Sequence, residues 1–159
     1  MRAAVPAAVW AAARLYERAF AADPALADAF SRAGGHRYNA ACYAARAARG
    51  DGTDALADPA KRAALRAKSL AWLQADLAVW QKRAAAPSGS ERKTAASAMT
   101  HWLGDSDPTG TRGGLIRLDI PPAERVEWDK FWTDVKATLT AARKPPPPPE
   151  VTPPPRPKG

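Results

Sequence analysis

Apolar residues in the first 143 positions recur at the spacing of helix turns, and they do so in five segments. In the first segment, from Pro6 to about Ala22, the apolar positions are Val9, Ala13, Tyr16 and Phe20. Intervals of four, three and four residues bring side chains to one face of a helix. The pattern therefore predicts a helix here with one buried face.

The other four predicted helices cover residues 24–49, 59–85, 88–103 and 121–143. Asp23-Pro24 and Asp58-Pro59 are start signals, because a carboxylate can cap free N–H groups and proline has none to lose. Ser88 and Glu91 have the spacing of a capping box. Gly50 and Gly104 mark two helix ends. Gly34-Gly35 lies inside the second segment, where glycine is unfavourable, so we expect a break or a kink there.

Composition changes what these helices are expected to bury. The chain has 39 alanines, more than half of its 73 apolar residues, whereas Leu, Ile, Val and Phe together number only 22. This share of large apolar side chains is as low as the share found in many disordered chains. Alanine is, however, the best helix former, and six Trp residues supply bulk. We therefore expect an all-α domain of thin helices in close contact, not a β-rich domain.

The last 16 residues differ from the rest. Nine of the final 15 residues are proline, which favours an extended polyproline II chain. We expect a helical domain at 1–143 and a disordered proline-rich tail at 144–159, which acts as a linker or as a docking peptide for an SH3-like groove. No apolar run is long enough to span a membrane, so we expect a cytoplasmic protein. Cys42 is the single cysteine, which excludes an internal disulfide.

The chain carries a net charge of +8, unevenly distributed. Residues 1–50 have seven basic and three acidic side chains, residues 51–103 have eight and five, and residues 104–144 are balanced. A basic surface favours acidic partners or phosphate backbones. The basic residues are scattered over several helices, so solvated helix faces also explain them. We therefore do not expect nucleic acid to be the main partner.

Partial matches to catalytic and ligand motifs are incomplete. Residues 105–110 resemble the start of a calcium loop, but Ile116 stands where a bidentate glutamate is required. His36 and Cys42, six residues apart, fall on different helix faces, with no carboxylate placed to orient the histidine. We therefore expect no enzyme activity, no cofactor, no metal and no small-molecule ligand.

One polar line on the second segment is a candidate partner-binding site. If this helix is continuous, five residues at intervals of four, three, four and three share a face: Arg32, His36, Asn39, Tyr43 and Arg46. Arg, Asn and Tyr side chains suit a groove that binds a protein or peptide partner with acidic groups. A solvated helix face with hydrogen bonds between helices is the alternative.

The first helix and its turn resemble the second half of a tetratricopeptide (TPR) repeat. The matching positions are a small residue at Ala12, an aromatic at Tyr16, alanine at Ala19 and proline at Pro24. Residues 12–143 as a whole look like the C-terminal helical region of TPR proteins of planctomycete bacteria, many of which are eukaryotic-like serine/threonine kinases. The resemblance implies a TPR-like array of about five antiparallel helices and a role in protein interaction.

The sequence departs from such kinases because it has no glycine-rich ATP loop, catalytic-loop aspartate or Asp-Phe-Gly motif. We therefore expect a non-catalytic interaction module, the interaction region or a fragment of a kinase signalling protein. A basic helical nucleic-acid-binding protein and a regulatory kinase fragment remain alternatives. If the first helix lacks its repeat partner, Val9, Tyr16 and Phe20 should be under-packed on one side.

Overall fold

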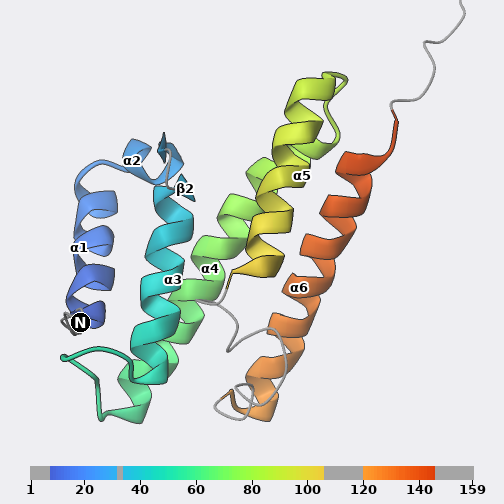
Figure 1. Ribbon diagram of the computed structural model, residues 1–159. Coiled ribbons are helices and arrows are strands. Elements are labelled where there is room, and N and C mark those ends of the chain that lie inside the picture. The colour runs from blue at the N-terminus through green and yellow to red at the C-terminus, as the bar shows by residue number, and fades with distance from the viewer. Residues whose placement is uncertain (1–7, 32–33, 106–119, 146–159) are drawn as a thin grey trace, which may run out of the picture.

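The computed structural model describes residues 8–31, 34–105 and 120–145. In these residues the chain is all-α apart from one short pair of strands (Figure 1). The helices are α1 (Val9–Ala22), α2 (Ala25–Asp28), α3 (His36–Arg49), α4 (Pro59–Ala84), α5 (Gly89–Gly104) and α6 (Pro122–Arg143). The calcium-like loop and the proline-rich tail lie outside the described residues, apart from Asp105, Lys144 and Pro145.

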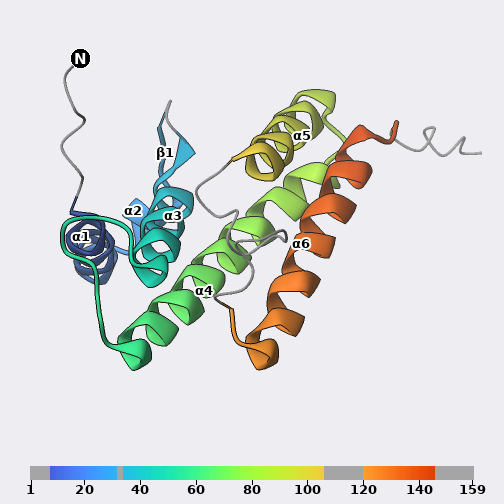
Figure 2. The same cartoon turned by 60° about the horizontal axis from the view of Figure 1, so that its bottom comes forward.

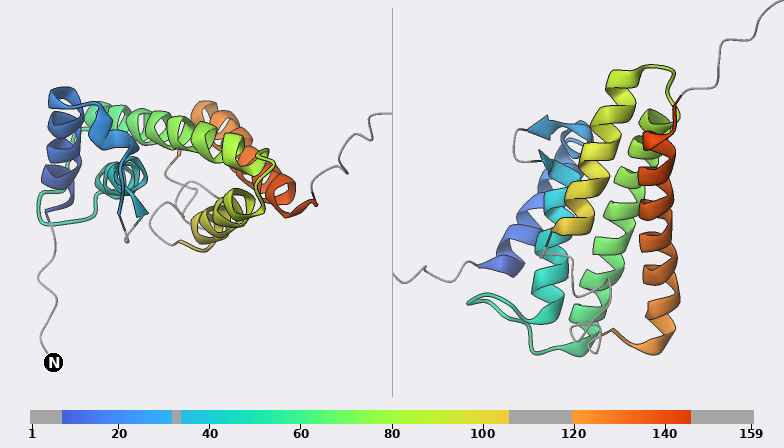
Figure 3. Two further views of the ribbon diagram at one scale, coloured as in Figure 1. Left: turned by 90° about the horizontal axis from the view of Figure 1, so that it is seen from above. Right: turned by 45° about the vertical axis from the view of Figure 1, so that its right-hand side comes forward.

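The five long helices alternate in direction along the chain (Figures 1 and 2). Helix α4 is the common packing partner of α3, α5 and α6. Helix α3 packs along α4, while α5 and α6 pack on α4 and on each other. Helix α1 lies mainly against α3, at the edge of the molecule opposite α6 (Figure 3). The short helix α2 and the strands connect α1 to α3 at one end of this array.

The break expected at Gly34-Gly35 is present, and it raises the number of helices to six in the part of the chain described. Helix α2 ends at Asp28, after only four residues. Strand β1 (Phe30–Ser31) then pairs antiparallel with β2 (Gly34–Gly35), and α3 begins at His36. The predicted helix of residues 24–49 is therefore wrong as a continuous element. The two glycines satisfy their backbone groups in a hairpin instead of weakening a helix interior.

Two predicted helix ends are confirmed by their hydrogen bonds. The Asp58 carboxylate accepts from the backbone N–H of Ala60 at 2.9 Å, which caps the first turn of α4. Gly50 follows α3 in the left-handed conformation, with φ of +90°. The Arg62 guanidinium closes the same end by donating to the carbonyls of Ala48 and Arg49, both at 2.6 Å. This arginine joins the end of α3 to the start of α4.

The expected capping box at Ser88 is wrong. Helix α5 does begin at Gly89, but the Ser88 hydroxyl makes no cap bond and lies 2.8 Å from the Ser90 hydroxyl. Helix α5 ends at Gly104, one residue later than the predicted Leu103, and Asp105 takes the C-cap position. The short Ser88–Ser90 contact competes locally with the backbone N–H groups for the serine oxygen.

Helix α1 is capped from a distance. The described helix begins at Val9 and has no side-chain cap from the residue before it. The carboxylate of Asp54, in the loop between α3 and α4, instead accepts from the N–H groups of Trp10 at 3.2 Å and Ala11 at 2.7 Å. Burial alone raises the pKa of Asp54, but these backbone N–H groups outweigh it and lower the pKa below 3.8. The cap thus ties the start of α1 to a loop more than 40 residues later.

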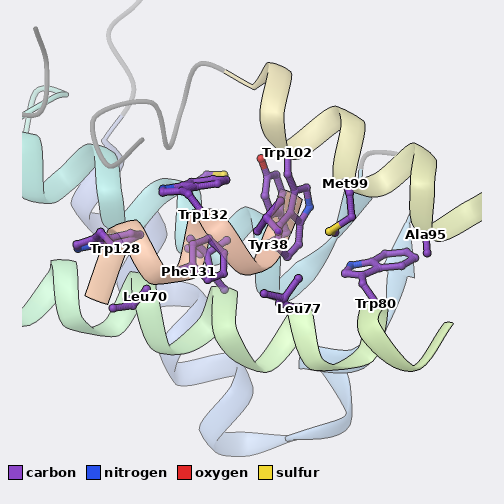
Figure 4. Close-up of a cluster of buried hydrophobic side chains, with 14 of the residues drawn as sticks. Tyr38, Leu70, Leu77, Trp80, Ala95, Met99, Trp102, Trp128, Phe131 and Trp132 are labelled. Carbon is purple, nitrogen blue, oxygen red and sulfur yellow. The ribbon is translucent and has the colours of Figure 1, made fainter. Parts of the chain in front are cut away.

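The main hydrophobic core lies between α3, α4, α5 and α6 (Figure 4). Its largest enclosed side chains come from α6, where Trp128 and Phe131 are each 2% exposed. The Phe131 ring meets Trp132 at 4.9 Å and Trp128 at 6.3 Å between ring centroids, both in edge-to-face contact. Helix α6 therefore supplies the two largest fully enclosed side chains of the core.

Helix α3 packs by a different means. Its buried residues are mostly alanines, namely Ala40, Ala41, Ala44, Ala47 and Ala48. Small side chains let α3 approach α4 closely enough for the buried Ser69 hydroxyl of α4 to donate to the carbonyl of Ala41 at 2.8 Å. The alanine-rich composition therefore has the role expected of it, close contact between helices.

The three apolar residues of α1 that were expected to be under-packed differ in their burial. Val9 is 0% exposed, so the expectation that it is under-packed is wrong. Tyr16 and Phe20 are half-buried, and the Phe20 ring meets Trp72 of α4 edge-on at 5.8 Å. Helix α1 is thus well covered at its start and keeps part of its aromatic surface exposed further along.

Among the described residues, one carboxylate lies inside the protein. Asp76 of α4 is 2% exposed, between the core residues Leu73 and Leu77. Arg37 of α3 approaches it to 3.9 Å, but the same arginine is 2.5 Å from Asp28 of α2. Burial raises the pKa of Asp76 to about 6, against the opposing effect of the Arg37 charge. A costly buried charge therefore lies where α2, α3 and α4 meet.

Candidate functional site

The predicted polar line lies on α3, apart from Arg32, which is outside the described residues. His36, Asn39, Tyr43 and Arg46 are all half-buried. The described part of the line is therefore neither buried nor fully exposed, and the hydrogen bond between Asn39 and Tyr16 of α1 is one that the alternative reading, a solvated face with hydrogen bonds between helices, also expects. It faces α1 along part of its length, since Tyr16 of α1 contacts its side chains.

Tyr16 covers the middle of the line. Its ring is stacked on Tyr43, with ring centroids 6.0 Å apart, and lies 6.4 Å from His36. Burial and the neighbouring Tyr43 raise the pKa of Tyr16, whereas a hydrogen bond with the Asn39 side chain acts in the opposite direction. Residues of the line thus hold α1 against α3, and what remains exposed lies toward α5.

The exposed part of the line opens into a hollow of about 370 Å³ between α1, α3 and the end of α5. We call it the tyrosine hollow. It is lined by Tyr16, Tyr38, Asn39, Cys42, Tyr43, Arg46, His101 and Asp105. Three residues of the predicted line therefore meet around one concave surface, whereas His36 does not line it.

The base of the tyrosine hollow is a hydrogen-bonded connection between α3 and α5. The Tyr38 hydroxyl donates to Asp105 at 2.9 Å, and its ring stacks on Trp102 with centroids 4.8 Å apart. Burial is the largest cause that raises the pKa of Tyr38 far above its ordinary value, followed by Cys42 and Asp105. Tyr38 is therefore a neutral hydrogen-bonding group that fixes Asp105 in place.

The rim of the tyrosine hollow carries charges of both signs. His101 Nε2 lies 3.5 Å from Asp105, and the His101 side chain is 61% exposed. Arg46 Nε lies 3.6 Å from Asp51, whose pKa is lowered chiefly by a hydrogen bond from Arg49. The Arg46 side chain is still 31% exposed. The hollow thus offers N–H and O–H donors with one carboxylate acceptor, a set suited to polar and charged peptide groups.

Sequence reasoning missed five of the lining residues, namely Tyr16, Tyr38, Cys42, His101 and Asp105. Tyr38 lies only one residue before Asn39, but on a helix that step changes the face. His101 and Asp105 are four residues apart at the end of α5, a spacing typical of neighbours on one helix face. Their approach to α3 depends on how α5 packs against the other helices. The spacing of residues within α5 cannot predict that.

The described residues contain no group of three or more His, Cys, Asp and Glu side chains that could hold a metal ion. None of the helices described has both the length and the apolar character that a membrane crossing requires.

Comparisons of this chain with protein-family models, with curated proteins and with solved structures return no match. The resemblance to TPR proteins therefore rests on the sequence positions alone.

Proposed function

We propose that this chain is a non-catalytic protein-interaction module that binds a peptide segment of its partner in the tyrosine hollow. One observation carries this proposal: Asn39, Tyr43 and Arg46, chosen from the sequence as a binding line, meet residues of α1 and α5 around one hollow. Tyrosine gives large contact area with little loss of side-chain freedom, and arginine binds carboxylates. Asp105, which accepts from the Tyr38 hydroxyl, adds a carboxylate to the lining of this hollow.

The proposal is tested by selecting dodecapeptides from a random displayed library on the wild-type chain. The selected peptides are then titrated against wild type and against the double variant Asn39→Ala with Arg46→Ala. We expect binding to weaken by about tenfold or more, because a central amide and a guanidinium are removed. Thermal unfolding of each variant shows whether the fold is kept.

The matched control is Gln74→Ala with Lys82→Ala, which removes an amide and a cation from exposed positions of α4. Neither side chain lines the tyrosine hollow. If the selected peptides bind both double variants with wild-type affinity, their binding site is elsewhere and the proposal is wrong.

We also propose that the helices form a TPR-like array. Its support is the position of Tyr16, the aromatic of the repeat pattern, against Tyr43 of the next long helix. Ala12 and Ala19, the small residues of the same pattern, are half-buried on α1. Mutation of Ala12 to Leu should then separate α1 from its neighbours and lower the melting temperature. An unchanged melting temperature would contradict a packing role for this position.

The proposed setting is a serine/threonine kinase signalling protein, by resemblance in sequence. The coding DNA upstream of Met1 tests it. A kinase domain or a further repeat helix in the same reading frame would support the proposal, and a stop codon immediately upstream would contradict it.

A further inference from the structure

A second hollow adjoins the tyrosine hollow on the outer side of α5. It has a volume of about 490 Å³ and is lined by Lys93, Ala96, Ser97, Thr100, His101 and Arg143. We call it the cationic hollow. Five of its lining residues come from α5, and Arg143 comes from the last turn of α6.

The cationic hollow presents donors without a carboxylate in its lining. Arg143 donates to the Thr100 hydroxyl at 3.4 Å, and among the described residues neither Arg143 nor Lys93 has an acidic partner. The hollows between α4 and α6 are different, because both contain Asp134. Unlike those, the cationic hollow has two cations whose charge is not compensated by a described neighbour.

The two hollows meet at His101, which lines both. From Lys93 to His101 the axis of α5 rises by about 12 Å, the length of roughly four residues of an extended peptide. A segment of about eight residues is therefore long enough to extend from the cationic hollow over His101 into the tyrosine hollow. The positive net charge of the chain would attract such a segment if it is acidic.

We propose that the two hollows form one binding surface for an extended acidic peptide, with Lys93 and Arg143 holding its carboxylates. The proposal rests on the proposed function and names the chemistry of the partner. The tyrosine hollow binds the other end of the peptide through Asn39 and Arg46.

The charge pattern favours a peptide over a nucleic acid. Asp105 lies in the tyrosine hollow and Asp51 lies beside Arg46, so cations and carboxylates alternate along the proposed path. A nucleic acid carries a phosphate at every step and would meet both carboxylates. A peptide can place acidic side chains at Lys93 and Arg143 and N–H groups at Asp105.

The test is a fluorescence-anisotropy titration of the full chain at low salt. The probe is a fluorescein-labelled octapeptide in which glutamate and serine alternate. We expect Lys93→Ala with Arg143→Ala to weaken binding by about tenfold, since two charge contacts are lost. The matched control is Lys82→Ala with Lys136→Ala, which removes the same charge from exposed positions of α4 and α6 outside both hollows and should weaken binding by about twofold or less.

The outcomes separate the two proposals. If the Lys93/Arg143 variant binds as the control does, while the Asn39/Arg46 variant is weakened, the cationic hollow is rejected and the tyrosine hollow stands. If wild type does not bind the acidic octapeptide, the acidic partner is rejected, and the library-selected peptides decide the proposed function independently. If a single-stranded DNA 12-mer binds more tightly than the octapeptide at the same salt concentration, the peptide proposal is overturned in favour of nucleic acid.

Discussion

The two sides of α4 are packed by opposite means. On one side, α6 buries Trp128, Phe131 and Trp132, and α5 adds Met99 and Trp102. On the other side, α3 buries mainly alanines, and α1 encloses little more than Val9 and Ala13. The first side gains stability from apolar area, which grows with side-chain size.

The alanine-rich side depends more on specific polar contacts. Asp54 caps α1, Arg62 closes α3, and Ser69 bonds the Ala41 carbonyl. Each of these contacts joins segments that are far apart in the sequence, and each is worth less than a buried aromatic ring. Helix α4 thus joins two kinds of packing, and we expect the α1–α3 side to contribute less to the free energy of unfolding.

The largest expected effect is on the aromatic side. Phe131→Ala should lower the free energy of unfolding by about 3 to 5 kcal/mol, because it leaves a cavity among three tryptophans. Val9→Ala removes a smaller, equally enclosed side chain of α1 and should cost about 1 to 2 kcal/mol. Urea unfolding followed by tryptophan fluorescence measures both. Equal losses in the free energy of unfolding for Val9→Ala and Phe131→Ala would contradict the expected difference between the two sides.

The alanine side should be sensitive to added volume. Ala44 is 0% exposed on α3, so Ala44→Leu should cost about 2 to 3 kcal/mol by forcing α3 away from its neighbours. Ala78→Leu makes the same change at an exposed position of α4 and should be nearly neutral. Thermal or urea unfolding of the pair tests this, and equal stabilities would mean that α3 is not closely packed.

The buried Asp76 makes the junction of the two sides dependent on pH. Its pKa of about 6 in the folded protein exceeds the ordinary 3.8, so the folded state holds its proton more tightly. This contribution to stability is complete below about pH 4 and is lost as the pH rises to about 6.

Asp76→Asn should therefore stabilise the protein by about 1 to 2 kcal/mol at pH 8 and change little at pH 3.5. Urea unfolding at several pH values measures the difference. An Asp76→Asn effect that is the same at both pH values would contradict the raised pKa, and destabilisation at pH 8 would show that the ion pair with Arg37 outweighs the cost of burial.

The smallest expected effect concerns the remote cap of α1. Asp54→Ala should cost about 1 kcal/mol, because two backbone N–H groups lose their acceptor. Since the pKa of Asp54 is lowered in the folded state, this contribution is present above pH 4 and is lost as the pH falls through the folded pKa. Asp58→Ala, which removes the local cap of α4, is the comparison. Unfolding curves at pH 7 should show losses of similar size.

Much of the fold could be predicted from local signals. The limits of α4 and α6 follow from Asp58-Pro59, from Pro121-Pro122 and from strong apolar spacing, and the end of α3 follows from Gly50. The break near Gly34 was expected, but the hairpin that replaces the helix was not, because pairing of Phe30 with Gly35 depends on backbone hydrogen bonds rather than side chains.

The candidate site could be predicted only in part. Asn39, Tyr43 and Arg46 share a face of one helix, which spacing alone indicates. Tyr16, His101 and Asp105 reach the same hollow from other helices, so their contribution depends on tertiary packing. The cap from Asp54 was missed for the same reason. Asp76 was missed although it lies three residues after Leu73 in the apolar line, because a carboxylate at such a position is normally read as an edge of the buried face.

Cys42 gives this molecule a built-in reporter of motion. It is the single thiol of the chain, 6% exposed, on the wall of α3 that borders the tyrosine hollow. Alkylation of Cys42 requires the side chains around it to move enough to admit the reagent, so its rate measures how often this wall of the hollow opens. A peptide that fills the hollow should slow that rate as its occupancy rises, and the natural thiol then reports on binding.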